Sequence, residues 1–567
     1  MARIRRLEVY NFRSIQKLVW FPSPNMNCLV GPGDSGKSTV LDAIDWCLGA
    51  RRNLPVTDAD FYNMSVDDEI IVRATIGDLQ DGLKTLDTYG PFLLGLDKEG
   101  NLEDEPSEGS ETVLTVQLTI GDDLEPQWHL KSDRAEAQGL SRGLTWGDRV
   151  NIAPNRIGVF ANQHLGWQRG SILNALTEEK ADASAALADA ARQARNSFGD
   201  TAGDQLKDTL GIISGAAQAL GVDVGDTVRA MLDAHSVNFS GSTISLHSSE
   251  GVPLRKLGLG SSRLLVAGLQ NRVAETASIA LVDEVEIGLE PHRISKFLLE
   301  LGSKTEATLF QIFMTTHSPV VLRELSGPQL YVIRRGDEHS VVQAGVDDAI
   351  QGTLRIASEA FLGTNVLVCE GATEVGLVRG IDRYRAEGGR STFAAAGGVL
   401  VDAGGVSKIY RSAMSFLTLG YNVATLRDDD VQPKEKDERD FVGVGGKVFK
   451  WTEGWAIEAE LFDCVSDEAV LQLWSYAKEL HGEQRILDHL RTACEGPIDL
   501  SNWFNEITEE KRRQLAAAAG SGSWFKRISH MEEAAYSIIG PDLDNCVHSE
   551  LPDLLSEILK WSGAIDG

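Results

Sequence analysis

The sequence predicts an α/β protein with more than one domain, and three observations support this prediction. The chain has 567 residues, which is too long for a single hydrophobic core and suggests roughly two to four domains. A glycine-rich loop at residues 31–38 lies between a short apolar run and a segment with helical spacing. A second strand-loop-helix series begins at Asn365.

Composition restricts the class of protein. Hydrophobic residues make up 42% and charged residues 24% of the chain, which is ordinary for globular proteins. No apolar run approaches the roughly 20 residues of a membrane-spanning helix. The basic N-terminus leads into no continuous apolar segment, so we expect a strand there and not a signal peptide. The net charge of −29 argues against nonspecific wrapping of DNA, although a local basic groove would still admit DNA as a substrate.

The six cysteines are scattered along the chain and form no CxxC pair. This spacing argues against a zinc site and against a disulfide framework. Because such cysteine usage suits a reducing compartment, we expect a cytoplasmic protein without membrane contacts.

The first third of the chain reads as strands around one helix. Residues 3–20 alternate as a strand does, and residues 27–30 form a short apolar strand before the glycine loop. Residues 39–48 have helical spacing. The acidic, Gly/Ser-containing residues 97–112 are typical of an exposed loop.

A helical, alanine-rich region follows at about residues 172–232. It fits either an exposed helix or a protruding arm that makes dimer contacts, and the composition does not distinguish the two. Strand-like apolar runs return at residues 279–282, 309–314 and 330–333, and residues 347–362 read as a helical connector.

The glycine loop matches the phosphate-binding pattern GxxxxGK(S/T), in the strand-to-helix context that this pattern requires. Glycines let backbone N–H groups close on the phosphates, and the helix N-terminus adds its dipole. Lys37 would reach the β and γ phosphates, and Ser38 would hold magnesium. A chance match in a Gly-rich loop is the alternative, which the context disfavours. We therefore assign ATP binding to Gly31, Gly33, Gly36, Lys37, Ser38 and Thr39.

Two later strand ends complete this site. An apolar strand at residues 279–282 ends in Asp283 and Glu284, which could bind magnesium and act as general base on water. Alone, such an ending is usually a strand meeting solvent. His317 follows another apolar strand, where it could sense a γ-phosphate.

The order of these motifs resembles the ABC-type ATPases of the SMC and RecF group. Residues 257–262 stand where the signature motif should be, although they depart from the fuller LSGG pattern, and residues 286–292 resemble the D-loop. The resemblance assigns Gly258, Gly260 and Ser261 to ATP binding across a dimer with composite sites. Gln163 is a candidate Q-loop residue, which the sequence does not fix.

Carboxylates cluster in the last third of the chain. Glu370 follows a strand and Glu374 stands on the next helix, while Asp428 and Asp430 alternate at the end of another strand. Glu458 and Glu460 follow in an alternating or near-helical segment. Such a group repels itself unless cations neutralise it, and hard oxygen ligands suit two Mg²⁺ or Mn²⁺ ions in phosphodiester cleavage. The alternative is a solvated acidic surface.

This second series resembles a Toprim domain, and an ABC-type ATPase followed by a Toprim domain resembles the OLD (overcoming lysogenization defect) family, most closely the nuclease subunit of Gabija-type anti-phage systems. Residues 360–362 and 402–406 match as well. The resemblance implies that Lys526 assists at the scissile phosphate and that Asp402 is a further metal ligand; a plain surface lysine is the alternative for Lys526. The implied domains are the first part of the ATPase at 1–170, a helical dimerisation insert at 171–240, the second part of the ATPase at 241–350 and the Toprim nuclease at 351–567.

From this resemblance we expect an ATP-regulated, divalent-metal-dependent DNA endonuclease in antiviral defence. Glu284, His317, Glu370 and Lys526 would be its catalytic residues. The expected cofactors are ATP and Mg²⁺ or Mn²⁺, and the expected partners are DNA, a homodimer or larger homo-oligomer such as a tetramer, and a superfamily-one helicase. The alternatives are a RecF-like repair clamp without cleavage, a topoisomerase, for which Tyr410 and Tyr421 lie nearby but no strand-passage domain is recognisable, and an ATPase sensor with a scaffold Toprim domain.

Overall fold

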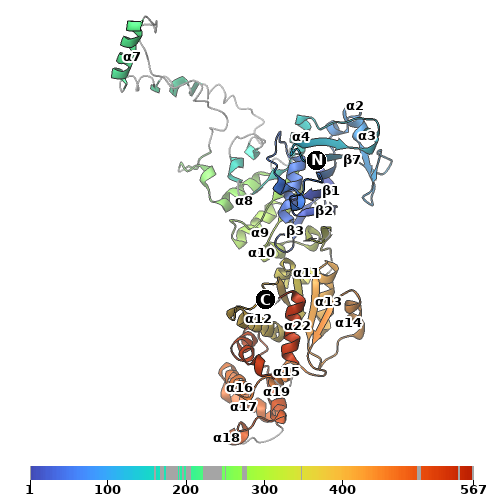
Figure 1. Ribbon diagram of the computed structural model, residues 1–567, viewed down its shortest axis with the longest axis vertical. Helices are drawn as coiled ribbons and strands as arrows, with labels where there is room; N and C mark the ends of the chain where they lie inside the picture. The colour runs from blue at the N-terminus through green and yellow to red at the C-terminus, as the bar shows by residue number, and fades with distance from the viewer. Residues whose placement is uncertain are drawn as a thin grey trace.

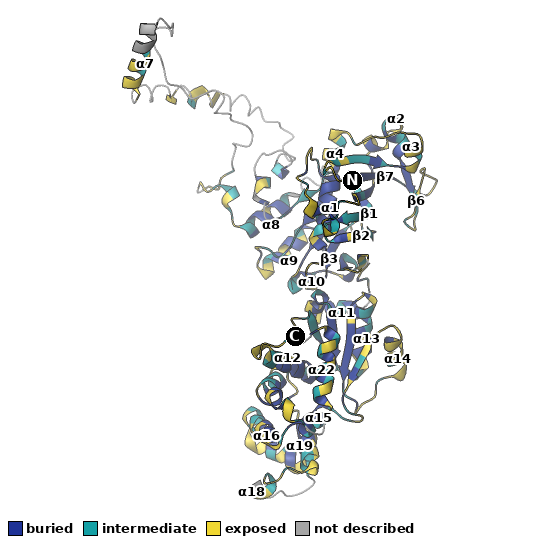
Figure 2. Cartoon of the chain, in the orientation of Figure 1, coloured by how far each residue is buried: buried dark blue, intermediate teal, exposed yellow. Residues whose placement is uncertain are grey.

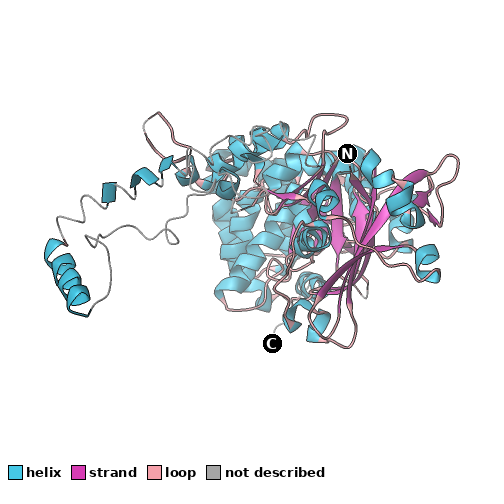
Figure 3. Ribbon diagram, turned by 90° about the horizontal axis from the view of Figure 1, so that it is seen from above, coloured by secondary structure: helices cyan, strands magenta, loops and turns pink. Residues whose placement is uncertain are grey.

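The computed structural model describes residues 2–158, 161–165, 171–173, 189–190, 192–194, 197–198, 206–220, 246–249, 251–270, 278–336, 338–346, 348–494, 500–546 and 550–564. Three β-sheets organise the described chain (Figure 1). The first two belong to the N-terminal half and the third to the C-terminal half. Seen from above, the strands gather towards one side of the body and many of the helices towards the other (Figure 3).

The first sheet has seven strands in the order β2-β1-β4-β7-β5-β6, with β8 also paired to β7, and its pairs are antiparallel. The expected strand at residues 3–20 is in fact a hairpin, because the chain turns at Arg13, whose φ is 50°. The strands are β1 (Arg3–Phe12), β2 (Ile15–Trp20), β4 (Ile70–Gly77), β5 (Leu94–Leu96), β6 (Leu102–Glu103), β7 (Glu111–Ile120) and β8 (Pro126–Lys131).

The second sheet carries the phosphate loop, with strand order β13-β12-β3-β11-β10-β9. Its pairs are parallel except for β12 with β13, so the carboxyl ends of the central strands meet at one edge. The strands are β3 (Met26–Val30), β9 (Asn155–Arg156), β10 (Ile279–Val282), β11 (Gln311–Thr315), β12 (Leu330–Arg334) and β13 (Ser340–Gln343).

Helix α1 (Lys37–Leu48) lies between the two sheets. The expected apolar face is confirmed, because Val40, Leu41, Ile44 and Leu48 are buried in a cluster with both sheets. Alternate residues of β3 serve opposite faces: Leu29 joins that cluster, and Cys28 and Val30 join the core under α8 (Leu259–Gln270), α9 (Pro291–Glu300) and α10 (Pro319–Glu324).

The third sheet is parallel, in the order β15-β14-β16-β17. Its strands are β14 (Asn365–Cys369), β15 (Gly398–Asp402), β16 (Asn422–Arg427) and β17 (Lys447–Lys450). Its crossover helices are α12 (Ala372–Glu387), α13 (Val406–Thr418) and α14 (Glu435–Gly443).

A helical region extends from this sheet (Figure 1), and its last helix returns to the sheet through a hydrogen bond of 2.9 Å from Asn365 Nδ2 to the Ser562 carbonyl. The structure pairs Cys464 with Cys546 as a disulfide, contrary to the expectation of unpaired cysteines. They are 82 positions apart in the sequence, so no local spacing could signal the pair. The helices are α15 (Ile457–Cys464), α16 (Asp467–His481), α17 (Glu483–Ala493), α18 (Leu500–Trp503), α19 (Glu509–Gly522), α20 (Ile528–Ala534), α21 (Gly540–Asp542) and α22 (Leu551–Ser562).

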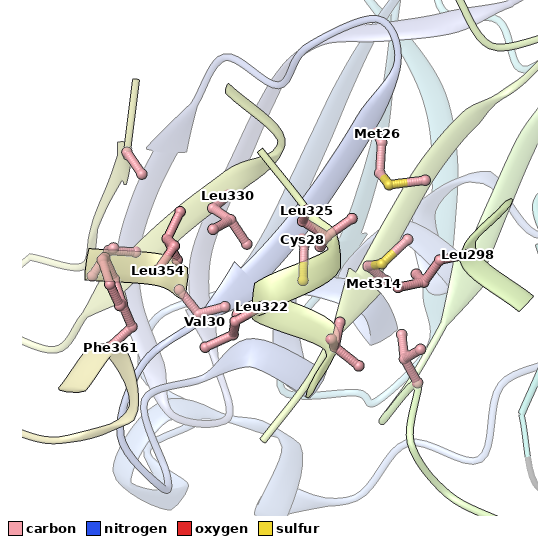
Figure 4. Close-up of a cluster of buried hydrophobic side chains, with 14 of the residues drawn as sticks. Met26, Cys28, Val30, Leu298, Met314, Leu322, Leu325, Leu330, Leu354 and Phe361 are labelled. Atoms are coloured by element: carbon pink, nitrogen blue, oxygen red, sulfur yellow. The ribbon is translucent and has the colours of Figure 1, made fainter. Parts of the chain in front are cut away.

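The two halves share one hydrophobic core. Leu354 of α11 (Asp348–Ile356) and Phe361 lie beside Val30, Leu322 and Leu330 of the ATP-binding half (Figure 4), and the same cluster continues into β14 and α13. The boundary expected at 350/351 therefore falls inside α11, whose residues range from buried, at Thr353 and Leu354, to exposed (Figure 2).

Most of the expected insert at 171–240 lies outside the described residues. Helix α7 (Lys207–Leu220) belongs to it and stands apart from the body in Figure 1. No helix in the described ranges is both long and apolar enough to cross a membrane.

Candidate functional site

The phosphate loop is shaped by its glycines and holds its lysine inside. Gly31 has φ 150°, and a Cβ there would lie 2.6 Å from the Ile333 carbonyl oxygen, so only glycine fits. Gly36 has φ 90°, the left-handed region that favours glycine. Lys37 Nζ donates hydrogen bonds to the carbonyls of Gly31 at 3.0 Å and Pro32 at 2.6 Å. Burial lowers the pKa of Lys37 to about 8, which nearby carboxylates including Asp34 and Glu284 partly offset.

Ser38 of this loop and Asp283 after β10, the two residues predicted to hold magnesium, meet at the edge of the second sheet. Ser38 Oγ donates to Asp283 Oδ1 at 2.9 Å. Thr315 Oγ1 donates to the same oxygen at 2.6 Å, and Arg156 lies 3.4 Å from Asp283 Oδ2. No role was predicted from the sequence for Thr315 or Arg156: the threonine stands two residues before His317, whereas no local pattern marks the arginine.

The backbone after Asp283 is held by a buried arginine. Arg263 of α8 is fully buried and donates to the carbonyls of Asp283, Glu284 and Ile287 at 2.7 to 3.2 Å. Glu284 has φ 45° and donates its N–H to Thr315 Oγ1 at 2.8 Å. These contacts fix the backbone of Glu284, the predicted general base, just after the end of β10.

Glu286 organises the predicted switch histidine. One of its carboxylate oxygens accepts from the Thr316 hydroxyl and the other from the His317 N–H, both at 2.7 Å. The His317 side chain is exposed at the same edge as Asp283. Gln163 is exposed in the 3-10 helix η5 (Ala161–Leu165), seven residues after Arg156. Its Q-loop role stays a prediction.

The predicted signature residues begin helix α8 against the D-loop segment. Ser261 Oγ accepts from Arg293 at 3.2 Å. A Cβ on Gly260 would lie 2.1 Å from the Gly288 carbonyl oxygen, whereas one on Gly258 would meet nothing within 4 Å. The close approach of the two segments therefore depends on Gly260 and not on Gly258.

We expect Gly260→Ala to lower ATPase activity and to destabilise the protein by about 1–3 kcal/mol, the usual cost of overpacking. The backbone of residue 288 must move, and with it the adjoining Ile287 carbonyl that accepts from Arg263. Gly268→Ala is the matched control on the same helix, since a Cβ there would meet nothing within 4 Å, and it should change either quantity little. Nucleotide turnover and thermal unfolding of both variants test this, and equal effects would contradict it.

The carboxylates of the third sheet converge at its carboxyl edge. Glu370 follows β14, and its Oε2 accepts from the Asp428 N–H at 3.2 Å. Glu374 on the first turn of α12 accepts from the Gly371 N–H at 2.8 Å. Asp428 follows β16 and accepts from the Ile457 N–H at 3.0 Å. Strand ends and two helix starts thus place these groups together.

Burial and mutual repulsion set the electrostatics of this cluster. Burial raises the pKa of Asp428 to about 8, and Glu374, Glu370 and Glu458 add to the shift. Burial likewise raises the pKa of Glu374 to about 7, with Glu370 and Glu458 contributing.

Two further predicted residues act on the same cluster. The pKa of Glu458 is raised by burial and by Asp430, while Lys526 opposes the shift. Asp430 also raises the pKa of Glu370, after burial. Asp430, which is exposed, and Lys526 are therefore near enough to these buried carboxylates to act on their charges; their roles in a reaction stay predictions.

The expectation that Glu458 and Glu460 share a face is wrong. The segment is helical, in α15, so residues two apart lie about 200° apart around the axis. Glu460 turns away and accepts from the Thr452 N–H at 3.2 Å. Asp402 ends β15 beside Cys369 and caps the Gly404 N–H at 2.8 Å; its role as a ligand stays a prediction.

The carboxylates fit hard divalent cations. Glu458 is buried, and its Oε1 has no hydrogen-bond partner in the described chain, so a charged acceptor is left for an external group. Carboxylate oxygens are the ligands that Mg²⁺ and Mn²⁺ prefer. Among the described residues, no three His, Cys, Asp or Glu side chains lie close enough together to form a metal-binding group.

A buried ion pair supports the Asp428–Asp430 turn from behind. Arg427 and Asp429 have side-chain exposures of 1% and 2% and lie 3.0 Å apart. Arg427 also pairs with Glu438 at 2.9 Å and donates to the Asp428 carbonyl at 2.8 Å. Asp429 accepts from Lys450 and from the Gly454 N–H, so it points away from the carboxylate cluster.

Several known proteins are similar to this chain. An OLD nuclease from Thermus scotoductus is 24% identical over 371 residues, which are 62% of this chain and 66% of that protein, so the match spans just under two thirds of the relative. The DNA replication and repair protein RecF from Prosthecochloris aestuarii is 32% identical over 65 residues, 12% of this chain and 18% of that protein.

Among solved structures, the SMC head domain from Thermotoga maritima matches with 15% identity and a TM-score of 0.27, over 61% of this chain and 100% of that one. An SMC head domain from Pyrococcus furiosus matches with 12% identity and a TM-score of 0.33, over 60% and 97% of the two chains. Residues 26–323, more than half of the chain, match the protein family described as "AAA domain, putative AbiEii toxin, Type IV TA system", and the chain belongs to this family.

Proposed function

We propose that the protein is an ATP-regulated DNA endonuclease of the OLD family, whose C-terminal half is a Toprim nuclease domain. The observation that carries the proposal is the carboxylate cluster at the edge of the third sheet: Glu370 accepts from the Asp428 N–H, Glu374 and Glu458 act on the charge of Asp428, and one buried oxygen of Glu458 has no partner among the described residues. The match to a protein named OLD nuclease supports it.

The residues of the cluster divide the work of phosphodiester hydrolysis. Bound Mg²⁺ or Mn²⁺ would supply a hydroxide nucleophile at neutral pH and stabilise the leaving oxygen. Glu370, Glu374, Asp428 and Glu458 would hold the ions, with Asp430 at the exposed rim. Lys526, whose charge acts on Glu458, would face the scissile phosphate.

The N-terminal half would gate this reaction. Ser38 and Asp283 would hold the magnesium of ATP, Glu284 would activate water, and His317 would contact the γ-phosphate. Signature residues of a second copy would complete the site, so we propose a homodimer or a larger assembly. Anti-phage defence, as in Gabija-type systems, and a superfamily-one helicase partner belong to the same proposal.

Cleavage of plasmid DNA tests the nuclease half. We expect wild-type protein to cut in Mg²⁺ or Mn²⁺ and Glu370→Ala to be inactive, while Glu468→Ala, which removes an exposed carboxylate of α16, should cut normally. If Glu370→Ala cuts as wild type does, the cluster is not the reaction centre. Binding of DNA without cutting in any metal would favour the RecF-like clamp, which the RecF match supports over 65 residues.

We expect Lys37→Ala to bind ATP about 10- to 100-fold more weakly, because a hydrogen bond to a charged group contributes about 1.5–3 kcal/mol. Any effect of ATP on DNA cleavage should disappear with it, while cleavage without ATP remains. Equilibrium binding of ATP and cleavage with and without ATP measure the two effects. Lys98→Ala, in an exposed loop, is the control, and an ATP effect that survives in Lys37→Ala would contradict the gating.

A further inference from the structure

A pocket lies at the junction of the two halves, away from both sites described above. It has a volume of about 140 Å³. The ATP-binding half lines it with the ends of α9 and α10, and α11 closes the other side. Its polar and charged lining residues are Ser303, Lys304, Arg323, Glu324, Ser326, Gln329, Gln351 and Arg355.

The lining of this pocket carries a net positive charge, whereas the protein as a whole is strongly negative. Three cationic side chains and one carboxylate line it, on a chain of net charge −29. Lys304 lies 3.8 Å from Glu324, and Arg323 lies 3.8 Å from Glu359 outside the lining. Arg355 is exposed and makes no ion pair within the described ranges. A positive charge is therefore available to a ligand.

An unpartnered donor lies in the same wall. Gln351 Nε2 is buried and has no acceptor among the described residues. Leaving a buried donor unsatisfied costs free energy, which an external acceptor would recover. By contrast, the Gln329 amide is satisfied, because it accepts from Ser326 N–H at 2.9 Å and donates to the Ser303 carbonyl at 2.9 Å.

The size of the pocket restricts the ligand. Pockets for drug-sized molecules are about 300–1,000 Å³, so this one is too small for a whole nucleotide. Arginine forks and amide donors suit the oxygens of a phosphate group.

We propose that this pocket binds a phosphate dianion, either a free phosphate or pyrophosphate or the terminal phosphate of a nucleotide. Arg355 and Gln351 of α11 would contact it from one side, with Lys304 and Arg323 from the other. Because the ligand would touch residues of both halves, it would stabilise their junction.

Thermal unfolding in the presence of inorganic phosphate, pyrophosphate or ATP tests this proposal. The experiment uses the full chain with Lys37→Ala, so that binding of these anions at the phosphate loop contributes little to the Tm. NaCl keeps the ionic strength constant. We expect millimolar anion to raise the Tm by a few degrees. Arg355→Gln and Gln351→Glu should each remove most of that shift, and Arg390→Gln, an exposed arginine after α12, should keep it.

The three anions separate the sources. A shift with phosphate or pyrophosphate assigns a free anion, and a shift with ATP alone assigns the end of a nucleotide. Sulfate-like stabilisation by salt exclusion acts on every variant equally. No shift, or equal shifts in Arg355→Gln, Gln351→Glu and Arg390→Gln, would overturn the proposal. Isothermal titration with pyrophosphate gives the affinity independently, and variants with an unchanged ligand-free Tm are folded.

Discussion

Asp428→Asn is expected to lower the rate of DNA cleavage strongly and, in the absence of metal, to raise the thermal stability of the protein. The carboxyl is buried among Glu374, Glu370 and Glu458, which disfavour its charged form together with burial. An amide of the same shape keeps the hydrogen bond from the Ile457 N–H and removes the charge. Functional sites commonly lower the stability of a protein, here through buried carboxylates that repel one another.

The loss of the Asp428 charge determines the size of both the fall in cleavage rate and the gain in Tm. Metal-assisted stabilisation is worth several kcal/mol in the transition state, so losing a ligand should lower the cleavage rate by on the order of 10²- to 10³-fold. A gain of 1 kcal/mol corresponds to about 2–4 °C in Tm for a domain of this size.

Titration with Mn²⁺ under a thermal ramp separates metal binding from catalysis. Metal should raise the Tm of wild type more than that of Asp428→Asn. Asp429→Asn is the neighbouring control, because that side chain faces Arg427 and Lys450. Loss of its charge should destabilise the protein but leave the rise in Tm with Mn²⁺ unchanged. If Mn²⁺ raises the Tm of Asp428→Asn as much as that of wild type, Asp428 holds no ion.

Local patterns predicted the elements that carry the phosphate loop and Asp283. The phosphate loop is continuous in sequence, and the strand that ends in Asp283 is apolar throughout, so each element is fixed by its own residues. Parallel pairing then brings Ser38 to Asp283.

Contacts between distant segments were not predictable. Arg263 reaches backbone carbonyls 20 to 24 residues away, and carbonyls have no sequence signature. Glu460 was misplaced because a short segment with carboxylates two apart fits a strand as well as a helix. The shared core at α11 likewise depends on packing between halves, which hydrophobic spacing does not reveal.

Arg427→Met is expected to cost about 3–5 kcal/mol of stability in the C-terminal half, because it removes the buried partner of the Asp429 carboxylate and leaves the half-exposed Lys450 as the cation paired with it among the described residues. The arginine also holds the Asp428 carbonyl and Glu438, so the turn that carries Asp428 and Asp430 should loosen and cleavage should fall with it. Urea unfolding, followed by the fluorescence of the C-terminal tryptophans, measures the loss. Arg439→Met, which removes an exposed pair with Glu435, should change stability by less than about 1 kcal/mol.

A double variant distinguishes an unpaired charge from a packing defect. If the buried Asp429 carboxylate without its arginine causes the loss, Arg427→Met/Asp429→Asn should recover much of the stability lost by Arg427→Met, since the charge disappears. Cleavage should stay low in the double variant, because the Asp428 carbonyl and Glu438 still lack the guanidinium. A double variant as unstable as Arg427→Met would mean that packing around the arginine stem, and not its charge, supports the turn.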